Sequence, residues 1–232
     1  MKKLLIMVTL MAMSLFVFIA CKNKGGIYGE HNGYEYVDLG LSVKWATCNI
    51  GANNPEDFGD YFALGEVKPK LMYTWENYKH CIDNYNNLTK YCNDSSLGNE
   101  GLVDNKIILD IEDDAAYNNW GGKWRMPTRE EQNELWNKCK WTWTTLNGVN
   151  GYLVTSKIKG YTDCSIFLPA TGIIINDSLY SEGTDAAYWS NTFNTGVNSS
   201  CGFNLSFFSD GSDKPWDHGS RYGGMPIRPV CP

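Results

Sequence analysis

The hydrophobic and polar positions divide the chain into a short leader and a long, mixed remainder. Two lysines precede an uncharged, mostly apolar run from Leu4 to Ala20, and Cys21 follows directly. This run is at the lower limit of the ~17–25 residues that a membrane-spanning helix needs. A basic start, an apolar run and a final small residue are typical of a secretory signal peptide, which we favour over a transmembrane anchor. Residues 1–20 are therefore predicted to be a signal peptide.

Strand-like segments dominate beyond residues 21–33, a short polar stretch that we expect to be a flexible tether. They combine aromatic and β-branched residues and are separated by Gly, Asn and Asp. An Asn-Gly pair at 147–148 predicts a hairpin between two of them. The predicted strands are Tyr34–Leu39, Val43–Cys48, Trp141–Thr145, Tyr152–Ser156, Ser165–Pro169, Ile173–Ile175, Ala187–Ser190 and Phe203–Phe208. Around the last two, residues 176–224 are polar and Gly-rich, so we expect a long irregular loop region there.

Only two segments have the spacing and the end signals of helices. In Asp110–Asn119, apolar residues recur at helical spacing, acidic residues lie in the first turn, and two glycines follow. In Thr128–Cys139, Thr128 and Glu131 form a Thr-x-x-Glu capping box. Strands, then two helices, then more strands indicate an α+β fold, with a single domain from residue 34 to 232.

The composition excludes one class of binding partner, nucleic acid held by bulk charge. The chain has 26 acidic and 20 basic residues, a net charge of −6. Removing residues 1–20 takes away two lysines and leaves a charge of −8. Binding to nucleic acid through bulk charge relies on clustered Lys and Arg, so we exclude it. With 14% aromatic residues the chain has the material for a packed core.

Cysteines are frequent, which is typical of an exported protein. Seven remain after Cys21, and an odd number implies at least one free thiol or a bond to another chain: Cys48, Cys81, Cys92, Cys139, Cys164, Cys201 and Cys231. Cys81 and Cys92 enclose a polar loop that a disulfide would close locally. Cys48 and Cys231 lie in apolar stretches near the two ends, and the connectivity stays open at this stage.

The sequence favours binding over catalysis. It contains no Gly-x-Ser-x-Gly, His-Glu-x-x-His or Gly-x-x-x-x-Gly-Lys-Ser/Thr motif, and its three histidines are scattered. Acids cluster between Asp104 and Asp114, but without the regular spacing of a calcium loop, and capping explains acids at a helix start. We therefore predict no cofactor, no metal and no enzymatic activity.

Aromatic and short polar residues in the region 176–224 are the candidate binding residues. Flat rings supply contact area, and short polar side chains supply adaptable hydrogen bonds. Trp216, between a proline and an acid, is the favoured exposed anchor, whereas Trp189 follows an apolar stretch and suits a core strand equally well. The candidates are Trp189, Asn191, Trp216, Asp217, Arg221 and Tyr222.

Seven motifs carry a resemblance to a known family. In chain order they are Tyr36–Leu41, Trp45–Ala52, Gly59–Glu66, Trp120–Thr128, Ile166–Ala170, Tyr188–Ser190 and Ile227–Val230. Together they resemble the Fibrobacter succinogenes major paralogous domain, which occurs in exported lipoproteins and cell-surface proteins. Arg-Met-Pro-Thr at 125–128 and Arg-Pro-Val at 228–230 also resemble the wider C-type-lectin-like fold.

This resemblance implies a C-type-lectin-like arrangement in which the first and last strands pair, two helices flank the sheet, and residues 176–224 face the ligand. It places Tyr36–Cys48 near Pro226–Cys231, which makes a Cys48–Cys231 disulfide geometrically reasonable. The Glu-Pro-Asn and Trp-Asn-Asp motifs of calcium-dependent lectins are missing. The resemblance therefore does not imply calcium-mediated sugar binding, whereas stacking on Trp or Tyr needs no metal.

Residues 18–21 indicate where in the cell the protein is located. Ile19, Ala20 and Cys21 resemble a bacterial lipobox, with Phe18 where Leu is usual, so Cys21 would carry the lipid and attach the protein to the outer membrane. Which membrane face it occupies stays open. We predict a lipid-anchored envelope protein that recognises a glycan or a protein. The alternatives are a structural or assembly subunit, such as a pilus-tip component, and an enzyme acting on glycans or peptides.

Overall fold

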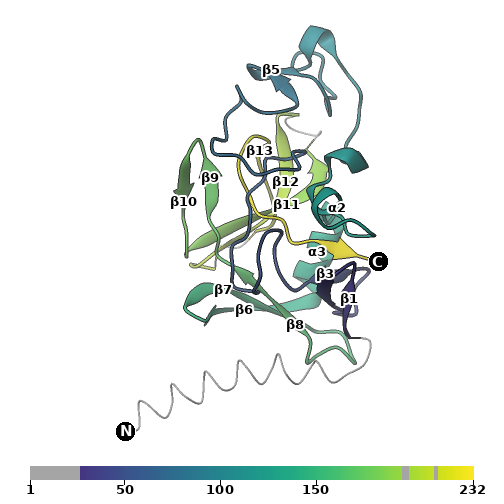
Figure 1. Cartoon of the computed structure of the whole chain (residues 1–232), viewed down its shortest axis with the longest axis vertical. Helices are drawn as coiled ribbons and strands as arrows, with labels where there is room; N and C mark the ends of the chain where they lie inside the picture. Colours follow the sequence, from purple (N-terminus) through teal and green to yellow (C-terminus); the bar gives the residue numbers. More distant parts are fainter. Residues whose placement is uncertain (1–26, 195–198, 212–213) are drawn as a thin grey trace.

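The computed structural model describes residues 27–194, 199–211 and 214–232, except for the side chains of 214–216. Short, mostly antiparallel strands form several small sheets, accompanied by two short α-helices (Figure 1). This confirms the α+β composition that the sequence predicts. The predicted signal peptide and Cys21 lie outside the described residues. None of the helices within them is both long and apolar enough to cross a membrane.

The first and last strands of the domain lie in one four-stranded sheet, in the order β1-β2-β3-β14. Its strands are β1 (Tyr28–His31), β2 (Tyr34–Val37), β3 (Lys44–Ala46) and β14 (Val230–Cys231). Val230 lies opposite Trp45 in the antiparallel register, so the predicted closeness of the two chain regions is confirmed. β1 falls within the expected tether, which is therefore part of the domain from Tyr28 onward.

The second predicted helix and the hairpin after it form as expected. Helix α3 (Arg129–Lys138) begins at Thr128, and its capping box with Glu131 is present. β6 (Cys139–Leu146), β7 (Val149–Ser156) and β8 (Ser165–Pro169) follow as a three-stranded antiparallel sheet. The two residues between β6 and β7, Asn147 and Gly148, have φ values of 48° and 90°, which an Asn-Gly hairpin turn requires.

The first predicted helix is divided into two pieces. A 3-10 turn, η2 (Ile111–Asp113), precedes the six-residue helix α2 (Ala115–Trp120). Between them Asp114 is extended, and its carboxylate accepts from the N–H groups of Tyr117 and Met126. Because this side chain caps α2, one continuous helix over 110–119 does not form.

Residues 176–224 form strands over most of their length, which corrects the expected irregular loop region. β9 (Ile173–Ile175) and β10 (Ser178–Tyr180) form a hairpin, and β11 (Asp185–Phe193), β12 (Cys201–Phe208) and β13 (Lys214–Ser220) form a three-stranded sheet. Polar side chains on β11 and β12 are buried, among them Ser190, Asn204 and Ser206. Their hydrogen bonds let them lie where the sequence pattern calls for apolar residues.

A smaller two-stranded hairpin, β4 (Cys81–Ile82) and β5 (Asn84–Leu88), lies at one end of the molecule, and the short 3-10 turn η1 (Asn99–Gly101) follows it (Figure 1).

The seven described cysteines are free thiols, so neither predicted disulfide forms. Cys231 lies opposite Lys44 in the register of β14 and β3, whereas Cys48 lies four residues further along, beyond the end of β3. A disulfide needs Cα atoms within roughly 7 Å. The thiols of Cys81 and Cys92 instead contact backbone carbonyl oxygens close to them in sequence.

One buried cation joins the two ends of the chain to the second sheet. Arg228 is 1% exposed, and its Nε donates to Asn49 Oδ1 at 2.8 Å. Nη1 donates to the carbonyl oxygens of Ala46 and Thr47, at the end of β3, and Nη2 donates to Phe167 O in β8 at 2.9 Å. A single side chain therefore satisfies four acceptors on two segments, residues 46–49 and β8.

Replacing Arg228 by Lys is expected to lower the free energy of unfolding by about 3 kcal/mol. The planar guanidinium group reaches four acceptors at once, whereas the single ammonium group of lysine cannot. Urea denaturation measures the change. Arg129→Lys is the matched control, since Arg129 lies on the half-buried start of α3 against the Phe203 ring, and it is expected to cost under about 1 kcal/mol. Equal midpoints for Arg228→Lys and the unaltered chain would contradict this role.

Candidate functional site

Two of the predicted ligand residues belong to the core. Trp189 is 0% exposed, and its Nε1 donates to Phe62 O at 2.9 Å. Asn191 is also buried, and its N–H donates to Pro127 O. The prediction that these side chains lie at the base of a ligand surface is wrong, because residues 107–109 and Pro127 cover the outer edge of β11.

The prediction that Arg221 contacts a ligand is also wrong. Its side chain is fully buried, with hydrogen bonds to the carbonyl oxygens of Lys90 and Tyr91. The guanidinium lies 4.3 Å from the centroid of the Phe193 ring. Arg221 therefore holds the loop at 90–91 against β11 and is not available to a ligand.

The remaining candidates are Tyr222, Asp217 and Trp216. Tyr222 is half-buried and contacts Trp75, with ring centroids 5.1 Å apart, a partner that the sequence did not suggest. Asp217 lies on β13 opposite Asn204. The backbone of Trp216 lies in β13, but its side chain is outside the described part of the structure.

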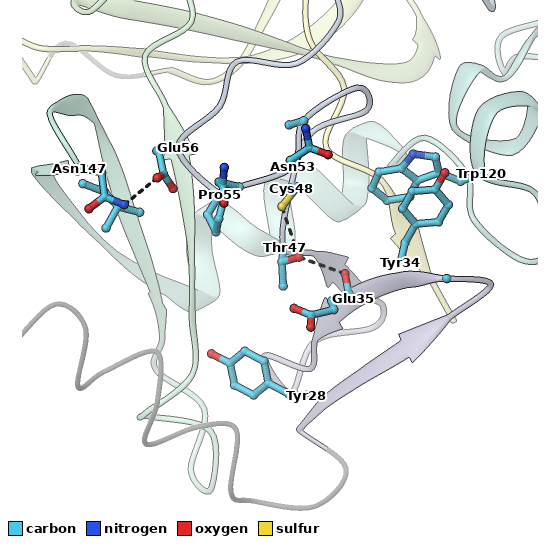
Figure 2. Close-up of a pocket in the computed structure, with 14 residues that line it drawn as sticks. Tyr28, Tyr34, Glu35, Thr47, Cys48, Asn53, Pro55, Glu56, Trp120 and Asn147 are labelled. Carbon is cyan, nitrogen blue, oxygen red and sulfur yellow. Dashed lines mark hydrogen bonds between the residues drawn. The ribbon is translucent and has the colours of Figure 1, made fainter.

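A groove of about 560 Å³ lies elsewhere, between the terminal sheet, the loop at 52–56, the end of α2 and the β6–β7 turn. Figure 2 shows Tyr34 and Trp120 at one end, Glu56 and Asn147 at the other, and Thr47 and Cys48 between them. The lining residues are Tyr28, Gly33, Tyr34, Glu35, Thr47, Cys48, Ala52, Asn53, Asn54, Pro55, Glu56, Trp120, Leu146 and Asn147.

The aromatic end of the groove is fixed by stacked rings. Tyr34 lies parallel to Trp120 at a centroid distance of 4.0 Å, and Trp120 meets Trp124 edge-on at 5.1 Å. Trp124 is fully buried, and its Nε1 donates to His31 O. Tyr34 is 36% exposed although Trp120 covers one of its faces, and both residues line the groove.

The polar end is held by a carboxylate and an amide. Asp57 accepts hydrogen bonds from the backbone N–H groups of Asn53 and Asn54, which fixes the loop at 52–56. Asn147 Nδ2 donates to Glu56 Oε1 at 2.6 Å and so connects this loop to the β6–β7 turn. Asn53 and Asn54 are both exposed on this fixed backbone, and Asn54 Nδ2 also donates to Asp57 Oδ2 at 3.1 Å.

The groove contains one thiol, that of Cys48, and its lining includes no histidine. Burial raises the pKa of Cys48 above its ordinary value, although the nearby Arg228 cation lowers it. Its Sγ lies 3.6 Å from Thr47 Oγ1, and no histidine is among the lining residues. A nucleophile needs a lowered pKa or an adjacent base, so the arrangement suits binding better than covalent catalysis.

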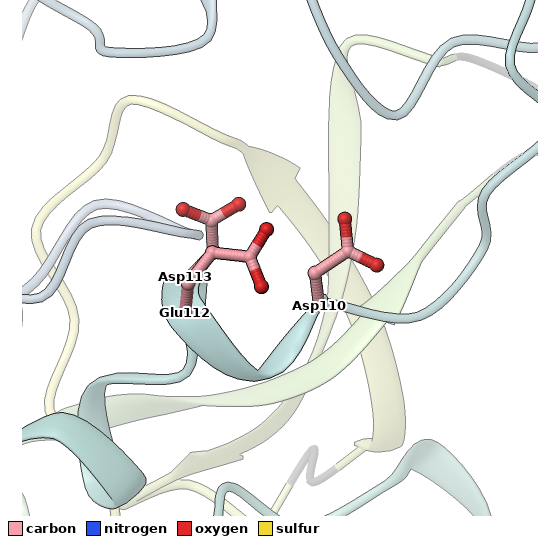
Figure 3. A group of neighbouring side chains, drawn as sticks. All are labelled: Asp110, Glu112 and Asp113. Atoms are coloured by element: carbon pink, nitrogen blue, oxygen red, sulfur yellow. The ribbon is translucent and has the colours of Figure 1, made fainter.

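Three acids at the start of the first helical region, Asp110, Glu112 and Asp113, are close enough to share a cation (Figure 3). Lys90 Nζ lies 2.7 to 3.2 Å from a carboxylate oxygen of each. Lys79 also contacts Asp113. These ammonium groups supply the positive charge that a metal would bring, so the cluster gives no ground for a metal site.

His80 is buried next to this cluster. Its Nε2 lies 3.1 Å from Gly65 O and 3.6 Å from Asp113 Oδ2. Burial lowers the pKa of His80 from 6.5 to about 4, although the Asp113 charge raises it. Burial also disfavours the Asp113 carboxylate, but hydrogen bonds from Lys79, Lys90 and Tyr91 hold the pKa of Asp113 well below its ordinary value. His80 is therefore neutral at pH 7.

Comparisons with family models, with curated proteins and with solved structures find no match for this chain. The resemblance to the Fibrobacter succinogenes major paralogous domain and the specific lectin-like fold therefore stay predictions.

The neutral, buried His80 predicts a pH dependence. Between pH 6.5 and about 4 the unfolded chain binds a proton on His80 that the folded chain does not, so stability is full above pH 6.5 and falls as the pH is lowered. From pH 7 to pH 5 this loss is about 2 kcal/mol. Urea denaturation at both pH values should show a smaller loss in His80→Gln and an unchanged loss in the exposed control His218→Gln. An equal loss in His80→Gln and the unaltered chain would contradict the assignment.

Proposed function

We propose that this chain is an envelope lipoprotein that binds a glycan in the groove of Figure 2 without chemically altering it. The observation that carries the proposal is the exposed Tyr34 ring, held in place by Trp120 and facing a groove with a polar far end. A sugar ring has an apolar face that packs on an aromatic ring, and hydroxyl groups that need hydrogen-bond partners.

The polar residues of the groove suit hydroxyl groups. Asn53 and Asn54 carry both donors and acceptors, and Glu35 supplies a carboxylate acceptor. The groove volume lies in the range of roughly 300–1,000 Å³ that is typical of ligand sites. Because the polar and aromatic ends lie apart, a short oligosaccharide fits the groove better than one ring.

The attachment to the envelope is part of the proposal. A lipidated Cys21, following the signal peptide, would hold the domain at the outer membrane through its acyl chains. Mass spectrometry of the protein extracted from membranes tests this: Cys21 is expected as the acylated first residue, and a mature protein with an unmodified Cys21 would contradict it.

A second candidate function is a structural or assembly subunit. Ile107, Ile108 and Ile111 are each about half exposed, at 49%, 47% and 54%. Apolar side chains grouped on an exposed segment are typical of a surface that a protein partner covers. A stoichiometric protein that co-purifies with the chain, with no glycan bound, would favour this function over glycan binding.

Tyr34→Ala is expected to weaken glycan binding by at least about tenfold, because the stacking surface is lost. Glycan-array binding of the full-length chain in detergent, followed by calorimetry with the strongest ligand, measures the effect. Tyr34→Phe should bind like the unaltered chain.

Tyr180→Ala is the control for Tyr34→Ala, since Tyr180 is 50% exposed on β10 and does not line the groove. Each variant must also keep the unfolding midpoint close to that of the unaltered chain. Equal affinities for Tyr34→Ala and Tyr180→Ala would remove the groove from consideration as the glycan site.

A further inference from the structure

The charged side chains that line the groove are all acidic. Of the described residues around it, Glu35 and Glu56 are the ones with a charged side chain, and none is Lys, Arg or His. Glu35 lies on β2 and Glu56 on the loop at 52–56, so the two carboxylates come from different walls (Figure 2). A ligand in the groove therefore meets negative charge from two sides.

Glu56 is a half-buried carboxylate. Asn147 Nδ2 donates to its Oε1 at 2.6 Å, which uses one of the several acceptor positions that a carboxylate has. Within the described part of the chain, no Lys, Arg or His forms an ion pair with Glu56. Burying a carboxylate costs free energy unless a cation pairs with it, so a cationic ligand would be favoured here.

The carboxylate of Glu35 belongs to a like-charged pair. Glu35 on β2 is directly opposite Glu30 on β1, and directly opposite residues project from the same face of a sheet. Tyr28, two residues before Glu30, lines the groove as Glu35 does, which places Glu30 on the same side of the sheet. Like charges directly opposite each other are destabilising, and a cation bound beside them would reduce the repulsion.

The negative charges also act on the middle of the groove. Burial is the main cause that raises the pKa of the Cys48 thiol, and the charges of Glu35 and Asp57 raise it further. The Arg228 cation acts in the opposite direction, but its side chain is 1% exposed and its hydrogen bonds go to protein acceptors. Arg228 is therefore not available to an anionic group of a ligand.

We infer that the groove prefers a glycan with free amino groups and disfavours glycans that carry carboxylate or sulfate groups. The inference rests on the proposed function, in which one sugar ring packs on Tyr34. An ammonium group on the same glycan would pair with Glu56 or Glu35. An acidic glycan would bring more negative charge to these carboxylates without meeting a lining Lys or Arg. Acetylation of the amine removes its positive charge and with it the preference.

Trisaccharides that share one β-1,4-linked backbone test this inference: the trimers of glucosamine, glucose and glucuronic acid. Calorimetry with the full-length chain in detergent at pH 6 measures their affinities, because amines are protonated and carboxyl groups ionised at this pH. The glucosamine trimer is expected to bind at least about fivefold more tightly than the glucose trimer, a factor that one exposed ion pair can supply. The glucuronic acid trimer should bind at least about fivefold more weakly than the glucose trimer.

Glu56→Gln should reduce the preference for the glucosamine trimer over the glucose trimer by at least about threefold, and Glu35→Gln should reduce it as well. Glutamine keeps a side-chain oxygen that can accept from Asn147, so Glu56→Gln retains the contact between the loop and the β6–β7 turn. Glu182→Gln is the matched control, since it removes the same charge from an exposed position outside the groove. It should leave the preference unchanged.

Equal affinities for the glucosamine and glucose trimers, or no binding of the glucosamine trimer, would overturn the inference. So would a preference that persists in both Glu56→Gln and Glu35→Gln, because the charge of the whole chain would then be its cause. Trilysine that binds as tightly as the glucosamine trimer would show that charge alone is recognised, which also overturns it.

These outcomes are separate from the test of the proposed function. If another glycan from the array binds and loses affinity in Tyr34→Ala, the groove remains a glycan site and only the preference for amines is rejected. A glycan array without any binding rejects the proposed function itself.

Discussion

The buried guanidinium of Arg228 is the interaction on which the closure of this domain depends. A charged group is costly to bury, and it is stable here because Asn49 and the carbonyl oxygens of Ala46, Thr47 and Phe167 accept its N–H groups. These acceptors come from the start of the domain and from β8, whereas Arg228 itself comes from the end. β14 itself pairs with β3 over two residues and forms a bridge with Arg125, so Arg228 adds the side-chain contacts that connect it to β8.

The hydrogen bonds of Arg228 also hold one side of the groove in place. Thr47 follows β3 directly, lines the groove and accepts from Arg228 through its carbonyl oxygen. The aromatic end is built on Trp124 through Trp120, and the polar end on the contact between Glu56 and Asn147. A ligand would therefore meet side chains that are already in position, which lowers the entropy cost of binding.

Where a structural feature depends on residues close in sequence, the sequence alone was sufficient to predict it. The capping box at Thr128 and the Asn-Gly turn at 147–148 each depend on residues close in sequence, and both form. Parts of β11 and β12 were predicted as strands, but their full lengths and β13 were not, because buried Asn and Ser residues hide the alternation that marks a strand. The groove was also missed, since Tyr34 and Trp120 are far apart in sequence and become neighbours only through the fold. Its one local signal was Asn54-Pro55-Glu56, a turn-like sequence that lines the polar side.

The proposed glycan site depends on Tyr34, whose ring is already stacked on Trp120. A crystal structure of the chain with the oligosaccharide that binds most tightly tests this most directly. We expect one sugar ring parallel to Tyr34, with hydroxyl groups near the loop at 52–56 and an unchanged stack of Tyr34 on Trp120. An oligosaccharide bound at any other surface, with the groove unoccupied, would contradict it.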